Sequence, residues 1–200
     1  MTSHTPDKPH MSPEGLRAAI IVAFASILTL IIAMRVLGDP GAPTTVLRVL
    51  DGDTLELADG TKVRLEGIDS PEIDQQSGGT ALRGLCRLVM GETVVFDRAP
   101  VPKTFDRVVG TLYVATDQPG TMVNVNATLA LRGHAWYSVS HPGRFAAKLQ
   151  AAEAKAREKR AGLWKFDHPV PPWDWRNGVR GYRVECQGGT CWLVPIYTNP

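Results

Sequence analysis

The chain has 200 residues and a formal net charge of only +2 at pH 7, so it lacks the strong basic bias of proteins that hold duplex DNA over a long footprint. A polar N-terminus and an apolar segment precede about 150 residues, a length that forms one domain with a substantial core. No internal repeat is evident. Any contact with a charged polymer is therefore expected to be loose and transient.

The apolar segment is predicted to cross a membrane. Residues 18–34 carry no charge, and Arg17 and Arg35 bracket them. The run is within the range that spans a bilayer, exceeds the usual apolar stretch of a signal peptide, and has no Ala-x-Ala site directly after it. We expect an uncleaved signal anchor that leaves the following domain on the extracytoplasmic side. The alternatives are a buried helix, or a cleaved signal peptide that yields a secreted protein.

The chain is expected to have five parts: a cytoplasmic segment, the transmembrane anchor, a linker, a β-rich domain, and a tail rich in proline and tryptophan. Their ranges are 1–17, 18–36, 37–44, 45–166 and 167–200.

Short runs at the start of the β-rich domain alternate apolar and polar residues, like strands with one buried face. They are Val46–Leu50, Leu55–Leu57 and Val63–Leu65, and a turn at 58–61 joins the last two. A further strand is expected at Thr111–Val114.

Carboxylates and an arginine gather around these runs, in Asp51-Gly52-Asp53-Thr54 and in Arg64-Leu65-Glu66-Gly67-Ile68-Asp69-Ser70-Pro71-Glu72. Either passage alone is most simply a turn, because Asp-Gly and Ser-Pro are common turn dipeptides. Together they supply carboxylates for a hard cation that keeps several waters, and a planar guanidinium that can grip a phosphate. The pattern favours a site for hydrolysis of a phosphodiester.

Three later segments predict helices, each ending near a glycine. Their ranges are 80–90, 123–132 and 144–160. The basic residues of the last helix are interpreted as a solvated face. His134, His141 and His168 show no compact ligand spacing, so surface or packing roles are favoured over a zinc site.

Near the C-terminus, Cys186 and Cys191 flank a glycine turn, a spacing compatible with a local disulfide in an oxidising compartment. Half of a zinc site is the alternative, but no second Cys or His pair stands nearby in the sequence. Cys86 has apolar neighbours at helical spacing and is expected to fill the core. Residues 178–200 are expected to form a small extra hairpin.

From Asp51 to Trp164 the chain resembles the thermonuclease, or staphylococcal nuclease-like, family. Asp51–Glu72 looks like the core motif of that family. The further similarities keep the order of the family along the chain, at Phe105–Gly110, Val125–Leu129, Gly133–Trp136, Leu149–Arg157 and Gly162–Trp164. The resemblance implies an α+β fold, mainly β, with a five-stranded OB-fold barrel and about three flanking helices. The predicted transmembrane helix precedes it.

The resemblance also implies a metal site. Asp53 and Asp69 match the carboxylates that bind calcium, Ser70 matches a residue that contributes its main-chain carbonyl, and Asp51 matches an acidic neighbour just behind them. Calcium follows from the family alone, because these ligand types also suit magnesium and manganese.

The catalytic roles are carried over in the same way. Arg64 and Arg107 match the arginines that bind the scissile phosphate, and Glu72 matches the proposed general base. The implied activity is endonucleolytic hydrolysis of DNA and RNA, with a preference for single strands. Trp136 and Tyr137 lie where the family has aromatics that contact bases, and stacking or core packing are both open for them.

The chain departs from the family beside the second arginine. Phe105-Asp106-Arg107 replaces Tyr-Gly-Arg, and an ion pair between Asp106 and Arg107 would weaken phosphate binding. One alternative function is therefore a barrel that binds nucleic acid or protein without catalysis. Another is a membrane-anchored interaction protein that displays the C-terminal hairpin. Apart from nucleic acid and the bilayer, no partner is predicted, and a monomer is expected.

Overall fold

The computed structural model describes residues 41–101, 106–187 and 189–197. The predicted cytoplasmic segment and transmembrane anchor lie outside these ranges. None of the helices in the described ranges combines the length and the apolar character that a membrane crossing requires.

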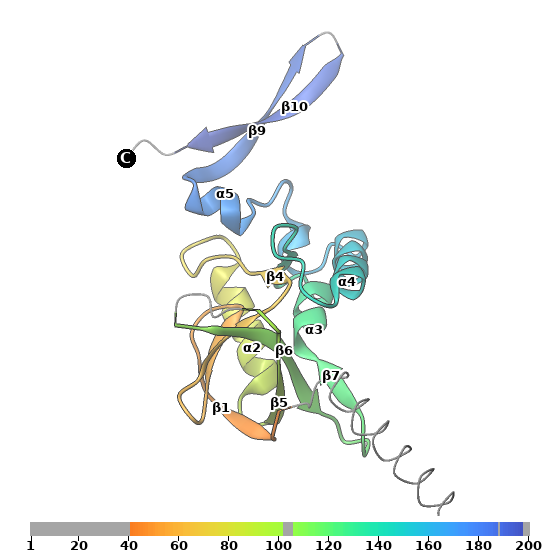
Figure 1. Ribbon diagram of the computed structural model, residues 1–200. Helices are drawn as coiled ribbons and strands as arrows, with labels where there is room; N and C mark the ends of the chain where they lie inside the picture. The colour runs from red at the N-terminus through yellow and green to blue at the C-terminus, as the bar shows by residue number, and fades with distance from the viewer. Residues whose placement is uncertain (1–40, 102–105, 188, 198–200) are drawn as a thin grey trace, which may run out of the picture. The chain divides into compact units, whose positions relative to one another are not determined.

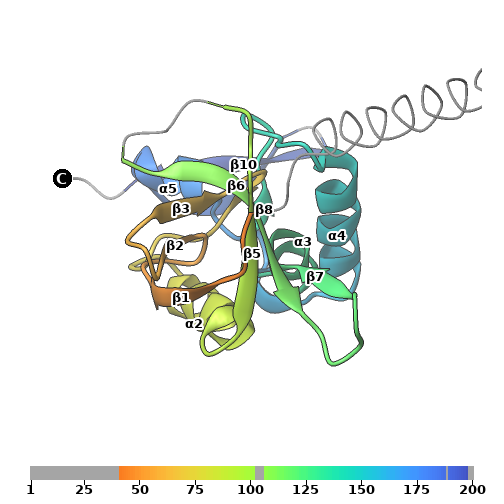
Figure 2. The same cartoon turned by 60° about the horizontal axis from the view of Figure 1, so that its bottom comes forward.

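Within the described residues, five strands close into a barrel, and this confirms the predicted α+β fold (Figures 1 and 2). The strands are β1 (Thr44–Val49), β2 (Thr54–Leu57), β3 (Lys62–Leu65), β5 (Thr93–Arg98) and β6 (Val108–Ala115). Antiparallel pairing runs in the order β3-β2-β1-β5-β6, and parallel pairing of β3 with β6 closes the ring. β7 (Met122–Asn124) extends the sheet beyond β6, and β4 (Ile68–Asp69) pairs separately with β8 (Trp136–Tyr137).

The barrel core follows from the alternation of apolar and polar residues. Leu55, Val63 and Leu65 are buried in the cluster that fills the barrel. Because side chains along a strand alternate between its two faces, Arg64 points away from Val63 and Leu65. The packing of β3 therefore turns a charged residue out of the core and towards the side where the acidic loops lie.

Helices cover the barrel: α2 (Gly78–Val89), α3 (Val125–Leu131) and α4 (Ala146–Glu158). α3 and α4 lie side by side on one flank, whereas α2 lies against β1 (Figure 2). The helix predicted over 123–132 begins too early, because Met122–Asn124 pairs with β6 as a strand. Asn124 then caps α3, since its side chain accepts a hydrogen bond from the Ala127 amide at 2.8 Å.

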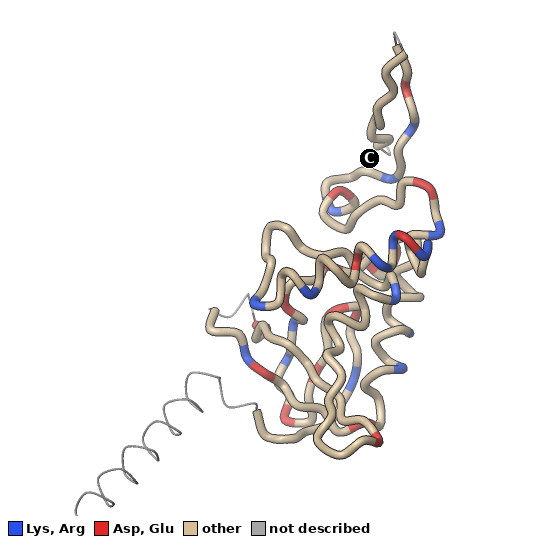
Figure 3. Tube along the Cα trace, turned by 90° about the vertical axis from the view of Figure 1, so that its right-hand side faces the viewer, with Lys and Arg blue, Asp and Glu red and all other residues tan. Residues whose placement is uncertain are grey.

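The domain ends with a short 3-10 helix η1 (Gly162–Lys165), and the tail then forms helix α5 (Pro172–Arg176) and a hairpin of β9 (Val179–Gln187) and β10 (Thr190–Tyr197) (Figure 1). A disulfide joins Cys186 to Cys191 across the hairpin, as predicted. Basic and acidic residues are interspersed along the described trace (Figure 3).

Candidate active site

The first acidic turn is held close to the second by a glycine. A Cβ atom on Gly52 would lie 2.7 Å from Cβ of Ser70 and 2.8 Å from Cβ of Ala81 on α2. Only a residue without a side chain allows this approach, so the glycine of the Asp-Gly-Asp turn has a packing role. The Ser70 amide then donates a hydrogen bond to Asp53 Oδ2 at 2.6 Å, and this bond ties the two motifs together.

Arg64 is the centre of the cluster, because it contacts both carboxylates predicted to bind metal. Its guanidinium forms an ion pair with Asp53, and Nη2 donates to Asp69 Oδ1 at 2.9 Å and to the Ile68 carbonyl at 3.2 Å. Desolvation by burial lowers the pKa of Arg64, and the charge of Asp69 opposes that shift. An arginine still remains protonated at neutral pH, so the pocket contains a fixed positive charge.

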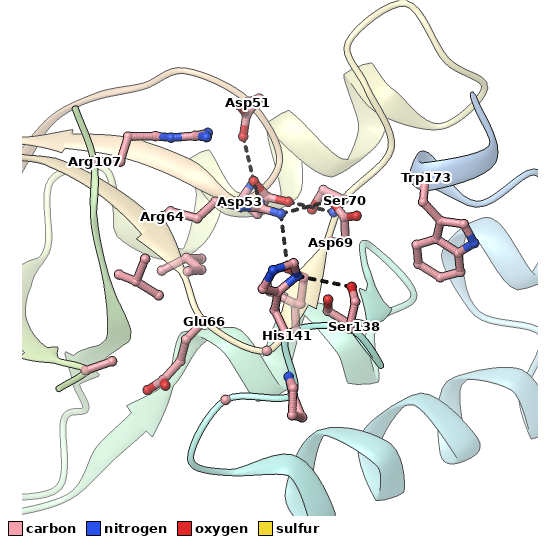
Figure 4. Close-up of a pocket in the computed structure, with 18 of the residues that line it drawn as sticks. Asp51, Asp53, Arg64, Glu66, Asp69, Ser70, Arg107, Ser138, His141 and Trp173 are labelled. Atoms are coloured by element: carbon pink, nitrogen blue, oxygen red, sulfur yellow. Dashed lines mark hydrogen bonds and ion pairs between the residues drawn. The ribbon is translucent and has the colours of Figure 1, made fainter. Parts of the chain in front are cut away.

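Asp51 supports the turn from behind. Its Oδ1 accepts a hydrogen bond from the Asp53 amide at 2.9 Å, which fixes the direction of the turn. Desolvation by burial raises the pKa of Asp51 above its usual value. The structure therefore places Asp51 beside Asp53, with its carboxylate bonded to the backbone of that residue (Figure 4).

Strand pairing brings Arg107 to the side of Arg64. Arg64 pairs with Val109 across β3 and β6, and Arg107 precedes Val109 by two residues, so the two arginines lie on the same face. Figure 4 shows both guanidinium groups extending towards the acidic turn. The neighbouring Asp106 forms its ion pair with Lys62. The ion pair with Arg107 that the sequence left open for Asp106 is not formed, because the side chain of Asp106 reaches the β3 lysine.

Glu72 is joined to the cluster by Arg176, a residue that the sequence analysis did not single out. Arg176 donates from Nη1 to Glu72 Oε1 at 2.7 Å and from Nη2 to Asp69 Oδ2 at 2.6 Å. Hydrogen bonding to Asp69 raises the pKa of Arg176 above its already high value. No motif marked this arginine, since it lies in the tail and more than a hundred residues from its partners.

These side chains line one cavity of about 880 Å³. Each residue predicted for metal binding or catalysis is among the lining residues, which include Asp51, Asp53, Arg64, Asp69, Ser70, Glu72, Arg107 and Arg176. The third carboxylate of the motif, Glu66, has a different role. It is buried, accepts a hydrogen bond from Thr111 Oγ1 at 2.6 Å, and forms an ion pair with Arg144 at 2.7 Å. These bonds tie the barrel to the loop that precedes α4.

The two aromatic residues with a predicted stacking role lie elsewhere. Trp136 is only 4% exposed and packs edge-on against Trp164, with ring centroids 5.3 Å apart. Tyr137 is partly buried, and its amide donates to Glu153. Both residues line a second cavity, next to α4 and the tail. Core packing accounts for Trp136, and contact of either ring with a base stays a prediction.

The donor set suits a hard cation. Asp53 and Asp69 are 4% and 6% exposed, and both carboxylates converge on the Arg64 guanidinium, so one cation could be reached by both. Ser70 Oγ is buried without a hydrogen-bond partner in the described part of the chain. No cluster of three or more His, Cys, Asp or Glu side chains fit for a metal occurs within the described ranges. A cation here would take its remaining ligands from carbonyl oxygens and water.

A closed five-stranded barrel with two arginines and a set of carboxylates on one side defines an OB-type protein with a site suited to phosphate chemistry. Residues 62–166, more than half of the 200-residue chain, match the family described as staphylococcal nuclease homologue. The chain belongs to that family.

Curated relatives agree with this assignment. A protein named micrococcal nuclease from Shigella flexneri is 30% identical over 168 residues, which cover 81% of this chain and 95% of the relative. Protein ParB from Escherichia coli is 34% identical over 146 residues, covering 70% of this chain and 82% of its own length. An uncharacterized endonuclease from Escherichia coli is 37% identical over 138 residues, covering 66% and 83%.

Proposed function

We propose that this protein is a calcium-dependent endonuclease that hydrolyses phosphodiester bonds of DNA and RNA and prefers single strands. The observation that carries the proposal is the convergence of Arg64 and Arg107 on one cavity that Asp53, Asp69 and Glu72 also line. Names of relatives that include nuclease and endonuclease support the same activity.

The two arginines have the geometry to bind one phosphate. Arg64 lies on β3, Arg107 directly precedes the parallel strand β6, and none of the ion pairs among the described residues uses Arg107. A planar guanidinium can donate paired hydrogen bonds to the oxygens of a phosphate, on which negative charge increases during attack. Arg107 would bind these oxygens first. Arg64 would bind them once the phosphate has replaced part of its contacts with Asp53 and Asp69.

Glu72 is proposed to act as the general base. Its carboxylate would take a proton from the attacking water, whose oxygen forms a bond to phosphorus in line with the leaving oxygen. The bond from phosphorus to the 5′ oxygen breaks, and the leaving oxygen takes a proton from solvent water while Glu72 returns its own proton to solvent. The products are a 3′-phosphate and a 5′-hydroxyl. Bound calcium would supply electrostatic stabilisation of the phosphate and help to orient water, with Asp53, Asp69 and the Ser70 carbonyl as its protein ligands.

The low net charge also supports a preference for single strands. The net charge of +2 and the interspersed charges along the described trace provide little attraction for a long stretch of duplex (Figure 3). Attachment to a membrane through residues 18–36, with the barrel on the extracytoplasmic side, is part of the proposal. The disulfide between Cys186 and Cys191 agrees with an oxidising compartment.

The direct test is digestion of denatured DNA and of RNA by the full-length protein, with calcium and with a chelator. We expect cleavage that requires calcium, and a loss of about 10²- to 10³-fold in kcat for Arg64→Ala, because one arginine that stabilises the transition state is removed. The matched control is Arg48→Ala, since Arg48 forms an exposed ion pair with Glu56 on β2. Negligible cleavage in calcium by the unaltered protein, by Arg64→Ala and by Arg48→Ala would favour the non-catalytic binding module.

A further inference from the structure

The tail beyond the matched residues 62–166 is in contact with the loop that carries Glu72. Two ties join them. Gln75 accepts a hydrogen bond on Oε1 from the Glu72 amide at 3.1 Å, and its Nε2 donates to the Val170 carbonyl. The second tie is Arg176, which bonds to both Glu72 and Asp69. The loop is thus fixed at its backbone and at its carboxylate by residues 170–176.

Among the described residues, Arg176 is the hydrogen-bond partner of the Glu72 carboxylate. The Glu72 side chain is 39% exposed, and Arg176 supplies the hydrogen bonding that orients its carboxylate within the described residues. A flexible carboxylate of this kind would sample several rotamers, and only some of them would face a water in line with the phosphate. Arg176 selects one position, because it bonds to Oε1 of Glu72 and to both oxygens of the buried Asp69.

Helix α5 itself is held against the body of the protein. Trp173, one turn before Arg176, packs edge-on against Trp136 with ring centroids 6.3 Å apart. Trp136 is buried against Trp164 of η1, so the contact continues into the domain. Trp173 and Arg176 both line the cavity that contains the arginines and carboxylates. A guanidinium on an anchored helix is a rigid support for a loop carboxylate.

We propose that Arg176 is a positioning residue for Glu72, and that residues 170–176 form a brace that makes the C-terminal tail part of the active site. The proposal rests on the proposed function of Glu72 as the base. Arg176 keeps the carboxylate of Glu72 at a fixed place relative to Asp69, and Gln75 keeps the loop backbone there. The chemistry is still performed by Glu72 and by the arginines that bind phosphate.

The test uses single-strand cleavage by the full-length protein, with kcat and KM measured separately. Arg176→Gln is expected to lower kcat by about 10- to 100-fold, because a misplaced base loses that much rate, and to leave KM within about threefold. Arg176→Lys should recover part of the loss, since it keeps the charge but cannot bridge two carboxylates in the same way. The control is Arg183→Gln, whose arginine pairs with Glu185 on the exposed hairpin and should behave as the unaltered protein.

A double-mutant cycle separates action through Glu72 from a merely structural effect. If Arg176 acts through Glu72, adding Arg176→Gln to Glu72→Gln should change kcat by less than about twofold. Full additivity would overturn the proposal, and so would a rise in KM with unchanged kcat, or a higher kcat in Arg176→Gln. Activity that depends on Arg64 but not on Arg176 would reject the brace and leave the proposed function intact. Absence of any Arg64-dependent cleavage would reject the proposed function itself.

Discussion

The barrel, which is mostly antiparallel, and the antiparallel C-terminal hairpin bury their side chains very differently. Strands β2, β3 and β6 place residues such as Leu55, Val63 and Leu112 in the fully buried core. Strands β9 and β10 leave most of their residues exposed, including Val184 and Trp192. The hairpin is therefore held by its own hydrogen bonds, its disulfide and its connection to α5, whereas the barrel is held by burial of apolar surface.

The boundary between the well-buried barrel and the poorly buried tail is therefore not the boundary of the candidate active site. The poorly buried tail begins with α5, and α5 brings Arg176 into contact with Asp69 and Glu72 of the domain. A description that stopped at the end of the matched family residues would omit a charged contact to the site.

The largest effect on stability is expected from Asn126→Ala, on the side of α3 that faces the barrel. Asn126 is 1% exposed; its Nδ2 donates to the Glu66 carbonyl at 2.9 Å, and its Oδ1 accepts from the Leu112 amide at 3.1 Å. Removal of the side chain leaves buried backbone groups without partners, so we expect a loss of about 3 kcal/mol in the free energy of unfolding, measured with urea.

The same substitution in the tail is the control for that measurement. Asn177 is exposed at the end of α5, so Asn177→Ala should change the free energy of unfolding by less than about 0.5 kcal/mol. Equal losses in the two variants would show that the tail and the barrel unfold as one unit, and the contrast drawn above would fail.

A smaller effect on stability is expected when a change of pH alters the protonation of His134. Its ring packs on α2, since a Cβ on Gly84 would lie 2.4 Å from Cδ2 of the ring. Desolvation lowers the pKa of His134 below the usual 6.5, and Arg132 and Arg87 add to the shift. Above pH 6.5 the ring is neutral in both states. As the pH falls through 6.5, His134 binds a proton in the unfolded chain before it does so in the folded protein. The free energy of unfolding should therefore decrease until the pH is below the pKa of His134 in the folded protein.

The measurement for His134 is the melting temperature as a function of pH below 7. In His134→Gln the decrease between neutral pH and the pKa of the folded histidine should be smaller than in the unaltered protein. An unchanged pH profile would mean that the histidine has no shifted pKa in the fold.

The smallest effect is expected from loss of the disulfide. In a variant with both Cys186→Ser and Cys191→Ser, the melting temperature of the barrel and the kcat should remain almost unchanged, because the bond joins directly opposed residues of an exposed hairpin. Limited proteolysis should instead cut faster within β9 and β10. A large loss of activity would show that the conformation of the hairpin affects the position of the active-site residues through α5.

Much of the barrel could be predicted from local patterns. When one face of a strand is buried, the alternation in Val63-Arg64-Leu65 allows only the register in which the two apolar residues face the core. The burial of Val63 and Leu65 and the outward direction of Arg64 therefore follow from the sequence. The start of α3 could not be predicted in this way, because Met122–Asn124 has helix-compatible residues but gains hydrogen bonds by pairing with β6. Tertiary pairing overrode local preference there.

The residues of the proposed site divide in the same way. Asp53, Arg64, Asp69 and Glu72 are close in sequence and belong to motifs, so the sequence indicated them and the structure shows them lining one cavity. The partner of Asp106 could not be predicted, since adjacency to Arg107 left an ion pair with that residue open and the fold supplied Lys62 instead. Lys62 lies 44 residues away in the sequence and comes near Asp106 only because β3 pairs with β6.

The sequence by itself determined several strands of the barrel, the acidic turns, the arginine between them and the cysteine pair of the hairpin, because each depends on short-range patterns of polarity and turn residues. The closed barrel was expected only through the family resemblance, because its closure pairs β3 with β6 over a long sequence separation. Only the tertiary structure decided that Arg176 meets Glu72 and Asp69. That contact joins positions 104 and 107 residues apart, and nothing in local composition encodes which of many arginines closes such a distance. The packing of α5 on Trp136 decides it, because it fixes the helix from which the Arg176 guanidinium reaches both carboxylates.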